Sequence, residues 1–227
     1  MRYSQILIKL MNTCFILGLI ILIYYAGCWG IADALTRQVR QEMRQWTKSP
    51  THLTQDRWTI VQQKTQQLAF LTPNAPDLLE LQAQLSHWQL RFVTYDSLSL
   101  YEDLQTQALN YFLQSVRTRP SSAYTWNNIT LLKYYLRQYD KQFFQALDNT
   151  ASLGKWEPLI QQDIVETGLI NWHRLPASSQ LTVIYMIERG LSMPFNQMST
   201  LIQRYHRRAT ICQNRQSNTP LLASTCS

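Results

Sequence analysis

The clearest hydrophobic pattern lies at the start of the chain. Residues 10–32 contain no charged side chain, and they follow a short segment, residues 1–9, that carries two basic residues. Twenty-three residues of α-helix extend over roughly 34 Å, which matches a hydrocarbon core about 30 Å thick. Aromatic residues gather near the far end of this run, as they do at membrane–water interfaces. The pattern predicts a transmembrane helix over residues 10–32.

Two other interpretations of this run stay open. A cleaved signal peptide usually has a shorter apolar region that ends at a small-x-small site, and Tyr24 and Tyr25 interrupt that pattern. A lipoprotein-type cleavage before Cys28 would follow an Ala-Gly pair, but an aromatic residue stands where an aliphatic one is wanted. We favour an uncleaved anchor, with residues 1–9 as a short cytoplasmic tail.

The orientation of the anchor follows only weakly from charge. Two basic residues and the amino terminus flank one end of residues 10–32. The other end has four basic residues set against Asp33 and Glu42, so the positive-inside rule is close to a tie. The very short N-terminal tail, with Arg2 and Lys9, favours an N-terminus in the cytoplasm. We therefore expect a single-pass protein of the bacterial inner membrane with the bulk of its chain in the periplasm.

Beyond the anchor, apolar residues recur at helical spacing, and no strand pattern of any length occurs. Residues 33–53 read as a charged juxtamembrane helix, broken near Pro50, and a linker. Thr54 and Asp77 are suitable N-caps for the next two helices. The predicted fold class is all-α: the transmembrane helix, then a tetratricopeptide-like array of antiparallel helical hairpins over residues 54–208.

The repeat interpretation depends on the stretch from Asp103 to Pro158. The second helix of a tetratricopeptide repeat and the turn after it have a small, an aromatic and a small residue followed by a proline, at fixed spacing. Ala108, Phe112, Ser115 and Pro120 have this spacing. Trp126 then opens the next repeat, and we expect its ring to pack between helices. At the other end of the chain, polar residues dominate residues 209–227, which we expect to be disordered.

The repeat pattern singles out three candidate binding residues. Tyr124, Asn127 and Tyr134 fall at positions of a first hairpin helix that face the concave groove of such repeats. Two aromatic rings and an amide suit a bound peptide tail, and aromatic rings also stack on sugar rings. The alternative is that neighbouring helices cover this groove.

Composition adds basic charge but no recognisable chemistry. The net charge is +7, which we interpret as a solvated basic surface rather than a site for anionic lipid or an acidic polymer. No zinc spacing, zipper or RNA-binding signature accompanies it, so no nucleic-acid partner is expected. The four histidines are scattered, and glycine-rich phosphate loops are missing, so we expect no metal and no cofactor.

One acidic pair invites comparison with catalytic carboxylates. Asp163 and Glu166 share one helix face, whereas the carboxylates of a glycosidase stand across a cleft, ~5–9.5 Å apart. We therefore interpret the pair as part of a solvated helix face and assign no catalytic residue.

The cysteines fall into two pairs. Cys14 and Cys28 lie too far apart along one helix to bond to each other. Cys212 and Cys226 lie in the polar C-terminal segment. They either close a small disulfide loop, if that segment is in an oxidising compartment, or remain free thiols.

Three short motifs stand in the second half of the chain. They are Tyr124, Trp126 and Asn128, then Asp140, Phe143 and Phe144, and then Gly154 to Pro158. These motifs resemble the Tyr-x-Trp-x-Asn, Asp-x-x-Phe and Gly-Pro-Trp-Glu-Pro segments of VpsP-type polysaccharide biosynthesis proteins, which join one membrane helix to a helical domain. Further similar positions are Gly168-Leu169, Trp172, Leu175 and Arg189-Gly190-Leu191. The chain departs from the family at Lys155, where relatives tend to have Pro, and from the repeat pattern at Thr130 and Gln142.

The resemblance implies a role in making or exporting a cell-surface polysaccharide, of exopolysaccharide or O-antigen type, without an assigned catalytic activity. The predicted function is a non-enzymatic scaffold, anchored through residues 10–32, that binds protein partners of a synthesis or export complex. Contact with the polysaccharide itself is a further option. A hydrolase that trims the polymer and a general envelope assembly adaptor are the alternatives.

Overall fold

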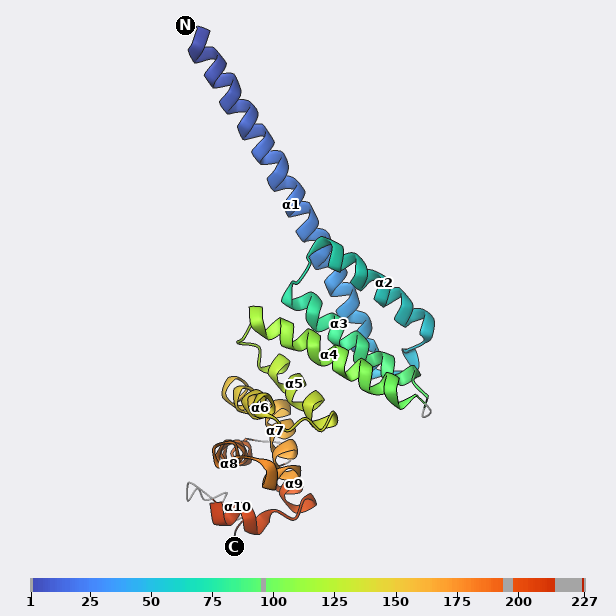
Figure 1. The fold of residues 1–227 in the computed structure, drawn as a ribbon, viewed down its shortest axis with the longest axis vertical. Helices are drawn as coiled ribbons and strands as arrows, with labels where there is room; N and C mark the ends of the chain where they lie inside the picture. The colour runs from blue at the N-terminus through green and yellow to red at the C-terminus, as the bar shows by residue number, and fades with distance from the viewer. Residues whose placement is uncertain (1, 95–96, 194–197, 215–225, 227) are drawn as a thin grey trace. The chain divides into compact units, whose positions relative to one another are not determined.

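The fold consists of helices throughout the part of the chain that the computed structural model describes, residues 2–94, 97–193, 198–214 and 226. Ten α-helices and three short 3-10 helices are present in these residues, and no strand (Figure 1). The predicted all-α class with one long apolar N-terminal helix is confirmed. The arrangement as tetratricopeptide-like hairpins stays a prediction.

The chain divides into two compact units, Met1–Leu85 and Ser86–Ser227. The boundary lies inside helix α3 (Pro76–Gln89). The sequence predicts one domain over residues 54–208 instead. The difference arises because the segment up to Leu85 packs with the C-terminal half of the first helix, so it belongs to the N-terminal unit.

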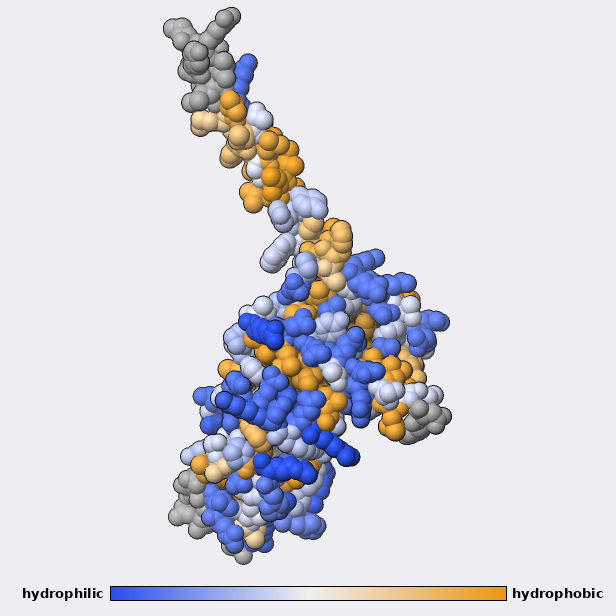
Figure 2. All heavy atoms as spheres, viewed as in Figure 1, coloured by the Kyte–Doolittle hydropathy of each residue, from blue (hydrophilic) through white to orange (hydrophobic). Residues whose placement is uncertain are grey.

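Helix α1 (Arg2–Lys48) contains the whole apolar run and continues without a break into the first unit (Figure 1). Its apolar part is not covered by the rest of the protein. Figure 2 shows this part as a hydrophobic, uncovered surface. The helix is long and apolar enough to cross a membrane. The first buried residue along the described part of α1 is Ala32, where the predicted span ends.

The second half of α1 forms the first unit together with helices α2 (Gln55–Leu71) and α3. Its buried residues share one helix face: Val39, Met43 and Trp46. Residues 33–48 are helical, as the sequence predicts, and in addition they pack against the rest of the first unit. The predicted end is right: α1 stops at Lys48, before the short 3-10 helix η1 (Pro50–His52).

Helix α2 runs antiparallel to α1, back toward the apolar segment. Arg57 near its start forms an ion pair with Glu42 at 3.8 Å. Further along, Lys64 Nζ donates to Gln38 Oε1 at 2.9 Å. The order of these contacts brings the C-terminal end of α2 beside the part of α1 nearest the predicted span.

Local cap chemistry sets the ends of these helices. The Thr54 hydroxyl accepts from the backbone N–H of Arg57, so the predicted N-cap of α2 is confirmed. Asp77 is not the cap of α3, because the helix already begins at Pro76. Its carboxylate instead pairs with Arg40 of α1. Trp58 Nε1 donates to the Leu85 carbonyl at 3.2 Å and so ties α2 to α3.

The second unit contains the remaining helices. They are η2 (Leu90–Phe92), α4 (Leu98–Thr118), α5 (Ala123–Tyr135), α6 (Lys141–Leu153), α7 (Pro158–Ile170), η3 (Trp172–Arg174), α8 (Ala177–Leu191), α9 (Met198–Arg204) and α10 (Arg208–Asn214). From α4 to α8 each helix packs on the next one, and the contact between α6 and α7 is the smallest of these. Alternate helices are also in contact, namely α5 with α7, α6 with α8, and α7 with α9.

The core of the second unit lies between helices α6, α7 and α8. It is filled mainly by large aliphatic side chains, together with Phe143 and Trp172. Phe143, Ile164, Leu169 and Ile187 have no solvent exposure. Helices α7 and α8 approach closely at Gly168, where an added Cβ would lie 2.3 Å from a methyl carbon of Val183. Close packing of this kind leaves no room for one more methyl group.

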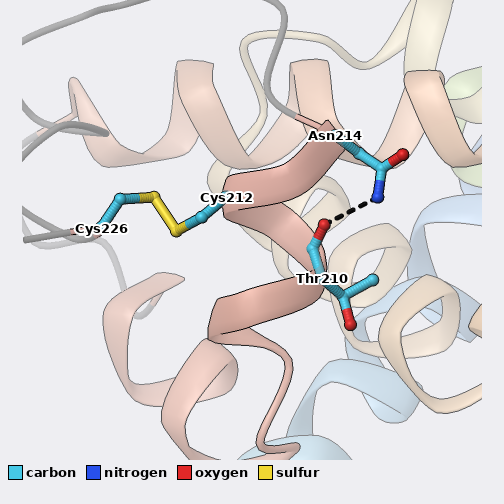
Figure 3. The surroundings of a disulfide bond; sticks show 4 residues. All are labelled: Thr210, Cys212, Asn214 and Cys226. Carbon is cyan, nitrogen blue, oxygen red and sulfur yellow. Dashed lines mark hydrogen bonds between the residues drawn. A yellow bond between two sulfur atoms is a disulfide. The ribbon is translucent and has the colours of Figure 1, made fainter.

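The C-terminal segment differs from the sequence prediction. The sequence predicts disorder over residues 209–227, but residues 208–214 form helix α10, because Ile211 is fully buried in the core. Cys212 of this helix is joined to Cys226 by a disulfide, with Cα atoms 5.7 Å apart (Figure 3). The disulfide alternative is thus the correct one. Residues 215–225 and 227 lie outside the described residues.

Candidate functional site: the seam between helices α5 and α7

Helices α5 and α7 lie side by side and run in the same direction. The Tyr124 hydroxyl, at the start of α5, donates to Glu157 Oε2 at 2.9 Å, and Glu157 precedes the first residue of α7. One turn further along α5, Asn127 Nδ2 donates to Asp163 Oδ2 at 2.6 Å. At the far end, Tyr134 shares a pocket with the last turn of α7. We call this contact the α5–α7 seam; it contains all three residues singled out from the sequence.

The seam does not expose the three predicted residues together. Tyr124 is 52% exposed, Tyr134 is half-buried, and Asn127 is buried. For Asn127 the alternative expectation is therefore the correct one, since α7 covers it. Trp126 also differs from its prediction: the ring is half-buried rather than enclosed, and its Nε1 donates to the Pro120 carbonyl at 2.7 Å.

A side-chain cap fixes the start of α5, and a proline fixes the start of α7. The Ser122 hydroxyl accepts from the Thr125 N–H at the start of α5. Pro158 occupies the first turn of α7, as the sequence predicts, because its missing N–H is not needed there. These local signals place Tyr124 and Glu157 at corresponding ends of two parallel helices, within reach of each other.

A buried lysine supports α5 from the other side. Lys133 Nζ donates to Asp140 Oδ2 at 2.8 Å and to Gln138 Oε1 at 3.3 Å, and its side chain is almost fully enclosed. Asp140 also caps helix α6 by accepting from the Phe143 N–H. Burial alone would raise the pKa of Asp140, but the bonds from the Lys133 ammonium and the Phe143 N–H outweigh it, so this pKa is lowered. The ion pair therefore holds the turn after α5 in place.

The two carboxylates of α7 both bond to neighbouring helices. Burial raises the pKa of Asp163 above the usual value, the bond from Asn127 opposes this rise, and the nearby Glu166 adds to it. Glu166 accepts from the Tyr205 hydroxyl at 2.5 Å and lies 3.5 Å from Arg204. The predicted solvated face is thus a half-buried one. Each carboxylate is engaged by a neighbouring side chain rather than set across a cleft.

A small pocket lies at the C-terminal end of the seam, and we call it the Tyr134 pocket. It has a volume of about 300 Å³ and is lined by Tyr134, Tyr135, Arg137, Tyr139, Ile170, Asn171 and Arg174. The Arg174 guanidinium lies over the Tyr139 ring, 4.6 Å from its centre. Aromatic faces beside guanidinium and amide donors suit a sugar ring or an anionic group.

Arg137 enters this pocket from an unusual backbone position. Its φ is +55°, and the turn closes through bonds from the Arg137 N–H to the Tyr134 carbonyl and from the Gln138 N–H to the Lys133 carbonyl. This is the Schellman pattern that ends many helices, and glycine is the usual residue at that position. An arginine there adopts a backbone conformation that glycine would adopt at no steric cost.

An exposed apolar surface lies at the N-terminal end of the seam. It consists of Tyr124, Leu153, Trp156 and Leu159, and we call it the Trp156 surface. Trp156 and Leu159 are each 61% exposed. The Arg189 guanidinium lies 4.8 Å from the centre of the Trp156 ring and holds one side of it.

A hollow of about 450 Å³ lies next to the Trp156 surface, between helices α6 and α8. Its lining includes Arg189 and is completed by Asp148, Ala151, Ser152, Lys155, Thr182, Tyr185 and Met186. The sequence pattern indicates for Trp156 only a place at a helix start. No signal in the sequence separates these residues from core residues, because large apolar side chains at this spacing would equally fit a buried helix face.

The described residues contain no group of three or more His, Cys, Asp or Glu that could hold a metal ion. Comparison of the chain with protein-family models, with curated proteins and with solved structures finds no match.

Proposed function

We propose that this chain is a membrane-anchored scaffold that binds a partner protein through the Trp156 surface. The observation that carries the proposal is the cluster of large apolar side chains exposed together at one turn. Exposed apolar clusters of this kind typically mark interaction sites, because leaving them in water costs free energy that a partner removes. Aromatic anchors of this type dominate the binding energy of many interfaces.

The Trp156 surface is held in place before a partner binds. Arg189 packs on one face of Trp156, and the Tyr124–Glu157 bond ties the turn to helix α5. Side chains that are already ordered lose less conformational entropy on binding. Lys155 and Arg189 line the hollow together with a single acidic residue, Asp148, so its lining carries a net positive charge. The partner segment that fits best therefore combines apolar and acidic side chains.

The tetratricopeptide-like arrangement is part of the same proposal. The bonds across the α5–α7 seam join residues 33 and 36 positions apart. These separations are close to the period of about 34 residues in tetratricopeptide repeats. The contacts between alternate helices also support this arrangement.

For the compartment we propose a bacterial inner-membrane protein with its soluble part in the periplasm. The Cys212–Cys226 disulfide supports this side of the membrane, since disulfides persist in oxidising compartments. A periplasmically active reporter fused after Ser227 should be active, and the same reporter at the N-terminus should be inactive. The reverse pattern would place the domain in the cytoplasm.

The process we propose is the synthesis or export of a cell-surface polysaccharide, on the basis of the resemblance to VpsP-type proteins. The Tyr134 pocket offers a direct contact for the polymer, because three tyrosines and two arginines line it. A role as a trimming hydrolase is less well supported, since Asp163 and Glu166 are both bonded to neighbouring side chains.

The Trp156 surface can be tested in cells by photocrosslinking. A crosslinking residue at position 159 should capture a defined partner of the polysaccharide machinery, and one at Leu98, a well-exposed residue of α4, should not. Trp156→Ser with Leu159→Ser should lower surface polysaccharide while the amount of folded protein is unchanged, and Leu98→Ser should lower neither. Normal polymer output in the double variant would contradict the proposal.

The polymer contact needs a variant that does not weaken the fold. Arg137→Gly removes a guanidinium from the Tyr134 pocket and places glycine where the φ is positive, which should stabilise the turn by about 1 kcal/mol. Weaker binding of an acidic polysaccharide together with an equal or higher melting temperature would support the pocket. Unchanged binding would remove it from the proposal.

A further inference from the structure

We infer that the turn between helices α2 and α3 rests on the bilayer, with Phe70 in the interfacial layer of the membrane. The inference concerns the first unit alone and rests on the proposed anchoring through residues 10–32. It begins with one side chain: Phe70, in the last turn of α2, is 88% exposed, more than any other described large hydrophobic residue.

The height of Phe70 relative to the membrane follows from its neighbours. Helix α2 ends at Leu71, and residues 71–78 line one side of a pocket of about 590 Å³. The other side of this pocket is helix α1, from Trp29 to Arg40. Phe70 directly precedes Leu71, and neighbouring helical residues differ by only about 1.5 Å along the helix axis. Phe70 therefore lies at the same level as the α1 residues that line the pocket.

That part of α1 is the end of the predicted span. Ala32 is the last residue of the apolar run, and it is only 6% exposed. Ala32 and Trp29, one turn earlier, both line the pocket together with the turn, and Trp29 is well exposed. The α2–α3 turn therefore reaches the level at which the hydrocarbon core ends.

The chemistry of the surroundings suits the membrane interface. The polar and headgroup layers add roughly 5–8 Å on each side of the hydrocarbon core, which corresponds to about one turn of helix beyond Ala32. Tryptophan side chains such as Trp29 favour this layer. The charges beside it are balanced, since Asp33 pairs with Arg37 and Asp77 pairs with Arg40. The expected partner is therefore a zwitterionic lipid surface, and Phe70 would be covered by lipid rather than by protein.

The experiment places a fluorescent label at one of three positions of the full-length chain in phosphatidylcholine vesicles. Two labelling sites are introduced by Phe70→Cys and by Ile60→Cys, each in a chain that also carries Cys14→Ser and Cys28→Ser. Both replaced residues are exposed, so neither change should disturb folding. The third site is the native Cys14 in a chain that carries only Cys28→Ser.

The label reports on these positions alone. Cys212 and Cys226 stay in their disulfide and do not react with the label. Quenching of the fluorescence is then measured with lipids that carry a nitroxide near the headgroup. The degree of quenching gives the proximity of each position to the interfacial layer.

Ile60 is the matched control. It is also an exposed apolar residue of α2, but it lies ten residues, or about 15 Å, further from the span. The expected result is strong quenching at positions 14 and 70 and little at position 60. Quenching at position 14 without quenching at position 70 would overturn the inference and leave the anchor standing. No quenching at either position would overturn both, and equal quenching at positions 60 and 70 would overturn the specific role of the turn.

Discussion

The two faces of helix α7 are built in different ways. The face toward α8 is apolar and close-packed, with Ile164 fully enclosed and Gly168 in contact with Val183. The opposite face carries Asp163, which accepts a hydrogen bond from Asn127 of α5, and Glu166, which accepts one from Tyr205 just after α9. Both faces are buried to some degree, but only the first excludes water completely.

This difference implies that the face of α7 toward α8 contributes most to the stability of the second unit, whereas the face toward α5 contributes less to stability and more to the protein surface. Removing apolar atoms from a close-packed face costs both transfer free energy and the free energy of a cavity. A hydrogen bond in a half-buried seam contributes much less, because water replaces the lost partner. Substitutions on the α8 side of α7 should therefore unfold the second unit, while substitutions along the α5–α7 seam should leave a folded protein whose surface has changed.

The largest effect is expected from Ile164→Ala. The side chain is fully buried, so its truncation should lower the free energy of unfolding by about 2–5 kcal/mol. Thermal unfolding of the full chain in detergent, followed by circular dichroism, measures this loss. A loss no greater than that of a surface variant would show that the α7–α8 face does not carry the stability assigned to it.

A somewhat smaller effect is expected from Gly168→Ala, which adds one methyl group. The new Cβ would lie 2.3 Å from Val183 Cγ2, and a β-branched side chain cannot easily turn away, so overpacking should cost about 1–3 kcal/mol. The double variant with Val183→Ala should be more stable than the sum of the two single losses predicts. Additive losses would mean that the two residues do not compete for the same space.

On the seam, Asp163 should give stability a pH dependence. Its pKa is raised in the folded state, so the unfolded chain releases this proton first, near pH ~3.9. This contribution to stability is complete below that pH and is lost as the pH rises through the raised folded pKa. Asp163→Asn should remove this decline and melt at a higher temperature than the parent at neutral pH. Parallel pH profiles of melting temperature for the two proteins would contradict the assignment.

The smallest effect is expected at the exposed end of the seam. Tyr124→Phe removes the hydroxyl that donates to Glu157, and both side chains are exposed. The change in the free energy of unfolding should stay within about 0.5 kcal/mol. Asn127→Ala is the comparison within the same seam, because the lost bond is buried there and should cost about 1 kcal/mol. Equal losses in the two variants would remove the distinction between the exposed and buried parts of the seam.

Local signals made much of the fold predictable. The end of α1 before Ser49, the Thr54 cap and the start of α7 at Pro158 each depend on a few adjacent residues. Helix α10 was missed because a single apolar residue, Ile211, anchors an otherwise polar segment. Its burial depends on a core formed by distant parts of the chain, which periodicity within the segment cannot reveal.

The candidate site was predictable only in part. The sequence located α5 and its polar positions, but the burial of Asn127 depends on a carboxylate 36 residues away. The exposure of Trp156 and Leu159 was equally hidden, because the same residues would fit a core if another helix covered them. Residue types thus indicated where contacts form, and the packing of later helices decided which contacts remain accessible.

The continuity of α1 has a mechanical consequence. Its 47 residues form one helix about 70 Å long, with no break between the apolar run and the residues that pack against α2. A flexible linker would allow the packed part of the first unit to tumble independently of the apolar segment. Because the helix is unbroken, any tilt, rotation or axial movement of the proposed anchor would be transmitted directly to Val39, Met43 and Trp46, in the part of α1 that packs with α2. The first unit would therefore move with the proposed anchor as one rigid body.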